Sequence, residues 1–129
     1  MKNQKRPLPE SFHDGLRAFN QRAFYEAHEH FETAWRQTPG EEREFFRAFL
    51  HMSGGFFRLT QNRPAAAKKF FAHAHKWFSG FEERHHRFDV AQILSQLERL
   101  MALIDQQIPP DEILTGQYQP IQPGEEQPL

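Results

Sequence analysis

The chain has 129 residues, with 16 lysines and arginines, 17 aspartates and glutamates, and no cysteine. This length suits a single domain, and the lack of cysteine excludes disulfides and thiolate metal sites. A formal charge of −1 gives no global reason to expect a nucleic-acid partner. The N-terminus lacks the apolar stretch of a secretory signal, and the most apolar segment, 45–59, is too short and too charged to span a membrane. We therefore expect a soluble, cytoplasmic protein with no membrane partner.

Composition favours an all-α fold. Strands favour β-branched residues, yet the chain has one valine and 14 phenylalanines. Phenylalanine is therefore the main filler of the core, and alanine lets helices approach one another. We expect a single-domain bundle of about five helices with antiparallel neighbours and an extended C-terminal tail. The residues expected in the core include Phe31, Phe49, Phe70 and Leu97.

Hydrophobic period and capping residues locate these helices. The predicted helices cover, in chain order, 11–19, 21–37, 38–61, 62–78 and 89–108. Asn20, Thr38 and Asp89 are the side chains expected to cap the second, third and fifth helices. The domain organisation that follows is an N-terminal extension at 1–10, a helical domain at 11–108, and a proline-rich, extended or partly disordered tail at 109–129.

The second predicted helix carries a polar pair inside an apolar stripe. The stripe consists of Phe24, Ala27, Phe31, Ala34 and Trp35. His28 and Glu32 fall within it and are four residues apart, so their side chains are neighbours on one face. Such a pair suits zinc, manganese, nickel or iron(II), provided that facing helices add further ligands. A buried His–Glu hydrogen bond that fixes helix packing is the alternative, and the spacing alone favours it.

The stretch around this pair resembles domain-of-unknown-function family 309, a family of small helical bacterial and archaeal proteins. The family hallmark, H-x-x-x-E-x-x-W or Y, is matched by His28, Glu32 and Trp35. The preceding Phe19-Asn20 and the run 25–29 also fit the family pattern, and the resemblance covers about residues 12–80. It implies a suggested metal site at this motif in a family whose biochemical function is not established.

The third predicted helix offers a further group for this site. His51 lies in a polar stripe beside the apolar face and is the best third ligand for His28 and Glu32. Gly54 and Gly55 sit in the middle of the helix, where each costs about 1 kcal/mol relative to alanine. They indicate either a close helix crossing or space for a ligand, and we expect a crossing opposite Trp35. Tyr25, Glu29 and Trp35 are predicted to line the pocket around the polar pair.

Other histidines lie in the second half of the chain. Lys69, His73 and Lys76 form a basic strip on the fourth predicted helix, which is typical of a solvated face. Two further pairs, Glu82 with His85 and Glu83 with His86, have the glutamate–histidine spacing of di-iron bundles. Di-iron chemistry needs such pairs on inward-facing helices, whereas these fall in a predicted loop, so the sequence disfavours it.

Two classes of function follow from the motif. The first is binding of a divalent metal or small ligand, with a metal-dependent hydrolase as one form of it, in which His28 and Glu32 are ligands and Glu29 is the base. The second is an interaction module in which the motif is structural and an aromatic groove around Trp35 takes a peptide or small molecule. The phenylalanine content also favours a homodimer, because apolar area outside a small core marks self-association.

Overall fold

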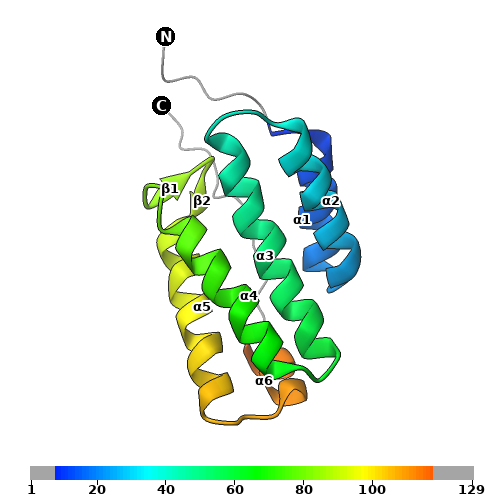
Figure 1. Ribbon diagram of the computed structural model, residues 1–129, viewed down its shortest axis with the longest axis vertical. Coiled ribbons are helices and arrows are strands. Elements are labelled where there is room, and N and C mark those ends of the chain that lie inside the picture. The colour runs from blue at the N-terminus through cyan, green and yellow to red at the C-terminus, as the bar shows by residue number, and fades with distance from the viewer. Residues whose placement is uncertain (1–7, 118–129) are drawn as a thin grey trace.

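The computed structural model describes residues 8–117, which form a helical bundle with one small hairpin (Figure 1). The elements in chain order are α1 (Glu10–Asn20), α2 (Phe24–Gln37), α3 (Glu42–Thr60), α4 (Pro64–Phe78), β1 (Arg84–His85), β2 (Phe88–Asp89), α5 (Val90–Asp105) and α6 (Pro110–Gln117). The all-α prediction is confirmed, with six helices in place of about five within this described part. No helix among residues 8–117 is both long and apolar enough to cross a membrane.

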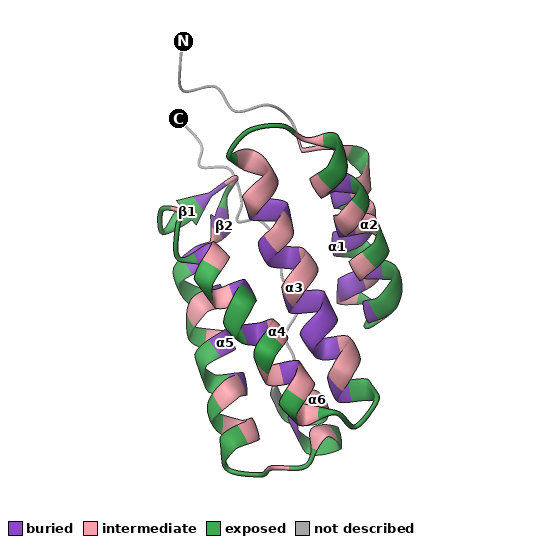
Figure 2. Ribbon diagram, in the orientation of Figure 1, coloured by how far each residue is buried: buried purple, intermediate pink, exposed green. Residues whose placement is uncertain are grey.

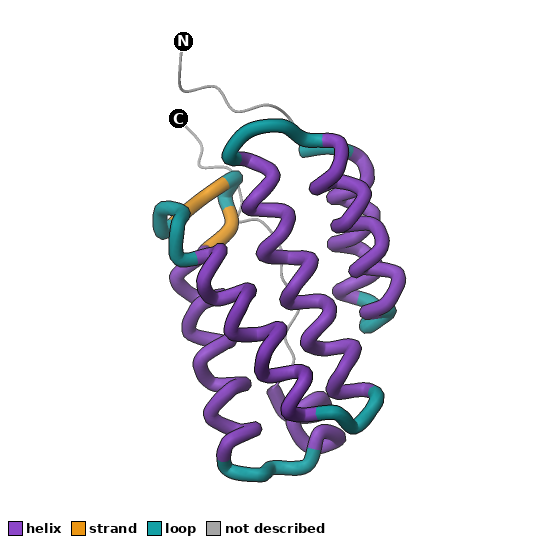
Figure 3. The backbone as a smooth tube through the Cα atoms, in the orientation of Figure 1, coloured by secondary structure: helices purple, strands orange, loops and turns teal. Residues whose placement is uncertain are grey.

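Helix α3 is the central element of the bundle. It packs against α2 on one side and α4 on the other, while α1 lies against α2 and α5 against α4 (Figure 1). Short loops join successive helices, so these neighbours run antiparallel as predicted (Figure 3). The buried residues line the helix faces that point to one another (Figure 2). Phe31, Phe49 and Leu97 are fully buried, as expected, whereas Phe70 is only half-buried.

Helices α3 and α5 end earlier than predicted, at Thr60 and Asp105, whereas α1 ends one residue later than predicted, at Asn20. Arg22, Asn62 and Gln107 adopt positive φ angles of 66°, 59° and 64°. At each, the following amide bonds back across the last turn, from Ala23 to Ala18 at 2.9 Å in the case of α1. This is the Schellman pattern, in which a left-handed residue ends the helix. Asn20 therefore lies inside α1 and does not cap α2, which corrects the prediction.

The start of α3 is also later than predicted. Its first residue is Glu42, and its N-cap is Glu41, with no hydrogen bond from the cap side chain, so Thr38 is not the cap. The prediction for Asp89 is confirmed, because its Oδ1 accepts a hydrogen bond from the Gln92 amide at 3.0 Å. The later start of α3 places the Glu42 carboxylate at the first turn, at the end of the bundle where the hairpin lies (Figure 1).

The expected extended tail is wrong for residues 110–117, which form α6. Pro110 stands at the first helical position, where the missing N–H costs nothing. Ile113 is fully buried, and α6 packs against α3 and α5, so this apolar side chain draws the segment onto the bundle. Arg22 Nη2 also donates to the Leu114 carbonyl at 2.6 Å. The rest of the tail expected at 109–129, and most of the expected extension at 1–10, lie outside the described residues.

Candidate metal centre

The motif residues of α2 lie on the face of the bundle that α3 shares with it. His28 is half-buried, and its Nδ1 atom is buried without a hydrogen-bond partner. Glu32 is also half-buried, and its Oε2 accepts a hydrogen bond from Arg36 at 3.0 Å. Burial lowers the pKa of His28, and the negative charges of Glu32 and Glu29 only partly offset that effect. The pair therefore shares one face, and the carboxylate is held by Arg36.

His51 is half-buried on α3. Burial, together with the charges of His73, Arg47 and His28, lowers its pKa to about 4. Its Nδ1 atom is buried without a hydrogen-bond partner, and its ring centroid lies 5.3 Å from that of His73 on α4. His51 thus lies beside a histidine of α4 and also feels the charge of His28 on α2.

The predicted pocket residues separate into two groups. The Trp35 ring lies between the guanidinium groups of Arg43, at 4.7 Å, and Arg47, at 5.1 Å. Arg47 also lies 4.6 Å from the Trp77 ring, so cation–π contacts join α2, α3 and α4. Tyr25 is 49% exposed, and a hydrogen bond to Glu29 raises its pKa.

The close helix crossing at Gly54 and Gly55 exists, but its partner is α4. A Cβ atom at Gly54 would lie 2.9 Å from the Phe70 ring, and one at Gly55 would lie 2.5 Å from the Phe71 ring. The prediction that Trp35 is the bulky residue opposite these glycines is therefore wrong. Two phenylalanines of α4 fill the space, which also explains why Phe70 stays at the rim of the core.

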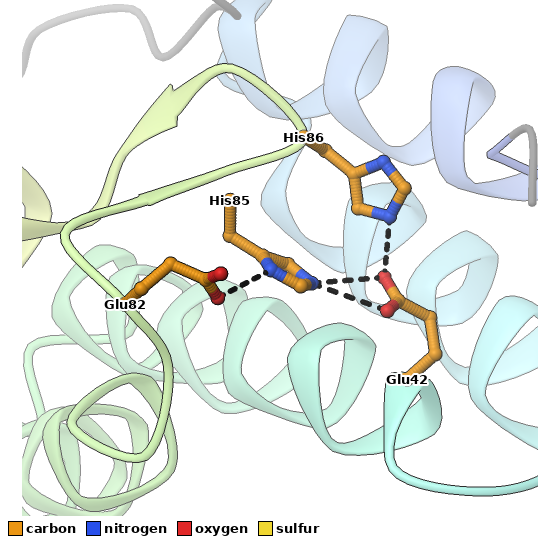
Figure 4. Close-up of polar contacts among 4 residues, drawn as sticks. All are labelled: Glu42, Glu82, His85 and His86. Carbon is orange, nitrogen blue, oxygen red and sulfur yellow. Dashed lines mark hydrogen bonds and ion pairs between the residues drawn. The ribbon is translucent and has the colours of Figure 1, made fainter. Parts of the chain in front are cut away.

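A different set of side chains meets at the start of α3. Glu42, His85 and His86 each place one potential ligand atom so that all three atoms lie within 4.8 Å of one another. The His85 Nε2 atom is 3.1 and 3.2 Å from the two Glu42 oxygens, and the His86 Nε2 atom is 2.6 Å from Oε2 (Figure 4). Glu82 Oε1 approaches the other ring nitrogen of His85, Nδ1, at 3.0 Å.

The hairpin that carries the two histidines turns in an unusual way. His85 pairs with Phe88, so residues 86 and 87 form a two-residue loop. His86 and Arg87 have φ angles of 50° and 66°, as the type I′ turn requires at both central positions. Asn-Gly is the favoured sequence there, since left-handed backbone costs other residues roughly 1–2 kcal/mol. This turn aims both histidine rings at Glu42, and strain of this kind concentrates at functional sites.

Burial makes the contacts among these groups strong. His85 is 5% exposed, and its ring packs between those of Phe45 and Phe81, with centroids 4.6 and 4.7 Å away. Burial raises the pKa of Glu42, but the hydrogen bonds from His85 and His86 outweigh it and lower that pKa to about 2. The Glu42 carboxylate is therefore ionised throughout the physiological range and available as a ligand.

Two cavities adjoin the three residues. The larger has a volume of about 650 Å³ and is bordered by Glu42 and His85. Its other lining residues are Glu41, Glu44, Lys76, Trp77, Gly80, Phe81 and Glu82. The smaller, of about 100 Å³, is bordered by Glu42 and His86. The cluster thus stands between two recesses in the surface.

The sequence indicates part of this cluster but not its function. Glu82 and His85 have the three-residue spacing of a di-iron motif, but their predicted position in a loop disfavours a metal site. The loop is a tight hairpin with fixed geometry, so it positions its histidines as firmly as a helix would. Glu42 had no local signal, because 43 residues separate it from His85.

Comparison with known proteins relates part of the chain to a protein family. Residues 12–70 match the family model described as "Domain of unknown function (DUF309)". This match covers slightly less than half of the chain, and over these residues the chain is similar to the DUF309 family. The resemblance inferred from the α2 motif is thereby confirmed. The DUF309 match contains Glu42 together with the α2 motif and ends before His85 and His86. No curated protein matches the chain.

Proposed function

We propose that this protein binds a divalent transition-metal ion through Glu42, His85 and His86. The observation that carries the proposal is the convergence of one ligand atom from each residue within 4.8 Å. Two of the three side chains are at least nine-tenths buried, since His85 is 5% exposed and His86 is 10% exposed. The sequence predicts metal binding at the α2 motif. This proposal keeps metal binding as the function but assigns it to the start of α3 and the hairpin.

The spacing of the donor atoms suits an ion. Zinc binds imidazole nitrogen at about 2.0–2.1 Å, so two donors of a tetrahedral ion lie about 3.4 Å apart. The nitrogen–oxygen separations here are 2.6, 3.1 and 3.2 Å. An outward movement of about 0.8 Å by the His86 ring, and of a few tenths of an ångström by the His85 ring, would therefore bring these separations to the spacing of an ion's ligands.

The donor set narrows the choice of metal. Two imidazoles with one carboxylate suit zinc, iron(II), manganese and nickel, whereas calcium and magnesium prefer a shell of oxygen atoms. Three protein ligands also leave coordination positions for water or another molecule, as in catalytic zinc sites. The donor set therefore favours a borderline-soft ion that keeps open coordination positions.

Glu82 supports the role of His85 as a ligand. Metal-binding histidines usually donate their second N–H to a carboxylate, which fixes the ring and its tautomer. The Glu82 carboxylate lies 3.0 Å from Nδ1 of His85, opposite the nitrogen that faces Glu42. Without an ion, His85 can donate to both carboxylates only as a charged imidazolium. An ion would replace one proton and leave the contact with Glu82 in place.

The test is metal binding by protein purified without an affinity tag. Calorimetry with zinc, manganese, nickel and cobalt should show a binding event whose affinity falls at least tenfold in His86→Gln. His75→Gln is the matched control, because His75 makes a similar single contact with Glu98 at 2.8 Å on the exposed surface. Equal binding by wild type and His86→Gln, or no binding of any ion, would refute the proposal.

A second metal site at His28 and Glu32, with His51 as a further ligand, stays a prediction. The observation that favours it is the pair of buried, unpartnered Nδ1 atoms of His28 and His51. His28→Ala tests this second site in the same calorimetric series. A variant that loses a second binding event but keeps the first would support the α2 site. A hydrolase that uses His28, Glu32 and Glu29 would further require this second event.

A further inference from the structure

The larger cavity gives the metal centre a place for a second molecule. Glu42 and His85 form part of its wall, so an ion held by them would lie at the edge of a cavity of about 650 Å³. A cavity of that volume lies in the range of sites that hold small organic molecules. The inference that follows rests on the proposed metal function.

The wall next to the metal centre is aromatic. The Phe81 ring lies against the His85 ring, with centroids 4.7 Å apart, and both residues line the cavity. Trp77 lines it as well and is half-exposed. A molecule coordinated to the ion would thus lie along aromatic surface that begins at a metal ligand. Flat aromatic groups stack favourably on such surfaces, beyond the apolar area that they bury.

The charges around the cavity select against anions. Besides Glu42, its lining holds the carboxylates of Glu41, Glu44 and Glu82, against the single ammonium of Lys76. Lys76 Nζ itself lies 5.5 Å from the centroid of the Trp77 ring. An extra negative group on a bound molecule would approach like charges, which costs affinity and serves as a means of discrimination.

We propose that the cavity is the ligand pocket of the metal centre. Its ligand is a small organic molecule that coordinates the ion through an oxygen-donor group and places a flat, aromatic body against Phe81 and Trp77. That body carries no negative charge. The hydroxamates provide suitable probes, because one chelating group can be combined with different bodies.

The experiment uses the full-length protein loaded with cobalt(II), whose visible absorption reports added ligands. Metal titration comes first, and failure to bind any of zinc, manganese, nickel and cobalt would overturn the proposed function and this inference together. With cobalt bound, benzohydroxamate should bind at least tenfold more tightly than acetohydroxamate. A benzohydroxamate with a carboxylate on the ring should bind at least tenfold more weakly than the parent compound.

Variants separate the pocket from the metal centre. Trp77→Ala should reduce the preference for the aromatic probe at least threefold, with cobalt affinity unchanged. Phe57→Ala is the control, because Phe57 is a half-buried aromatic residue of α3 that does not line the cavity. Equal binding of the two hydroxamates, or an aromatic preference that Trp77→Ala leaves intact, would overturn the pocket while the metal site stands.

Discussion

Acid should weaken the fold through Glu42, and the effect has a calculable size. The hydrogen bonds from His85 and His86 hold the pKa of Glu42 at about 2, against an ordinary value of 4.5. A group whose pKa is lower in the folded state adds stability above its unfolded pKa. That stability is lost as pH falls from 4.5 through about 2. At 1.36 kcal/mol per pKa unit, the shift corresponds to about 3 kcal/mol.

Solvent reduces this figure, since the Glu42 side chain keeps 28% of its exposure. We therefore expect Glu42→Gln to lose about 2 kcal/mol of unfolding free energy at pH 6, with the loss vanishing near pH 2. Urea denaturation in the presence of a chelator, at half-unit steps of pH, measures the difference. Glu98→Gln is the control, because the Glu98 side chain is 63% exposed beside His75. A loss that stays constant from pH 6 to pH 2 would refute the assignment to the carboxylate.

Two substitutions test the backbone. Arg87→Gly should raise the free energy of unfolding by about 0.5–1 kcal/mol, because glycine takes the left-handed turn position without strain. The substitution also keeps the backbone carbonyl that Arg84 contacts. A loss of stability on urea denaturation would contradict this. Gly55→Ala should destabilise by about 1–3 kcal/mol, because its Cβ would meet the buried Phe71 ring at 2.5 Å. A Cβ atom at Gly116 would meet open space instead, so Gly116→Ala should show no loss of stability. Thermal melts of the two variants measure the difference.

Helix identity and the ends of α2 and α4 could be predicted from local pattern, whereas the start of α3 and the end of α5 could not. The apolar periods of α2 and α5 and the cap at Asp89 are properties of a few neighbouring residues. The ends of α1, α3 and α5 depend on left-handed residues that are not glycine, so composition gave no warning of them. Helix α6 was missed because Pro109 and Pro110 suggested a break, although a proline at the first helical position also starts a helix.

The two candidate sites differ in the same way. His28 and Glu32 are four residues apart on one helix, so the sequence alone could place them on one face. The contact between Glu42 and His85 arises from the packing of the hairpin against the start of α3, which no spacing rule contains. The resemblance to DUF309 directed attention to the α2 motif, and its match ends before the hairpin histidines.

This arrangement predicts where metal binding should be felt. An ion held by Glu42, His85 and His86 would tie the first turn of α3 to the hairpin, and it stabilises only states in which that contact is intact. The Val90 amide donates to the Glu83 carbonyl at 2.8 Å and closes the hairpin segment, so it reports local opening there. With zinc at a hundred times its dissociation constant, exchange of that amide should slow by up to about a hundredfold where opening breaks the site. The Ala27 amide of α2, which donates to the Ala23 carbonyl, opens without disturbing the centre and should slow much less. Hydrogen exchange followed by NMR compares the two amides directly. Greater slowing at Ala27 than at Val90 would place the ion at the α2 motif instead.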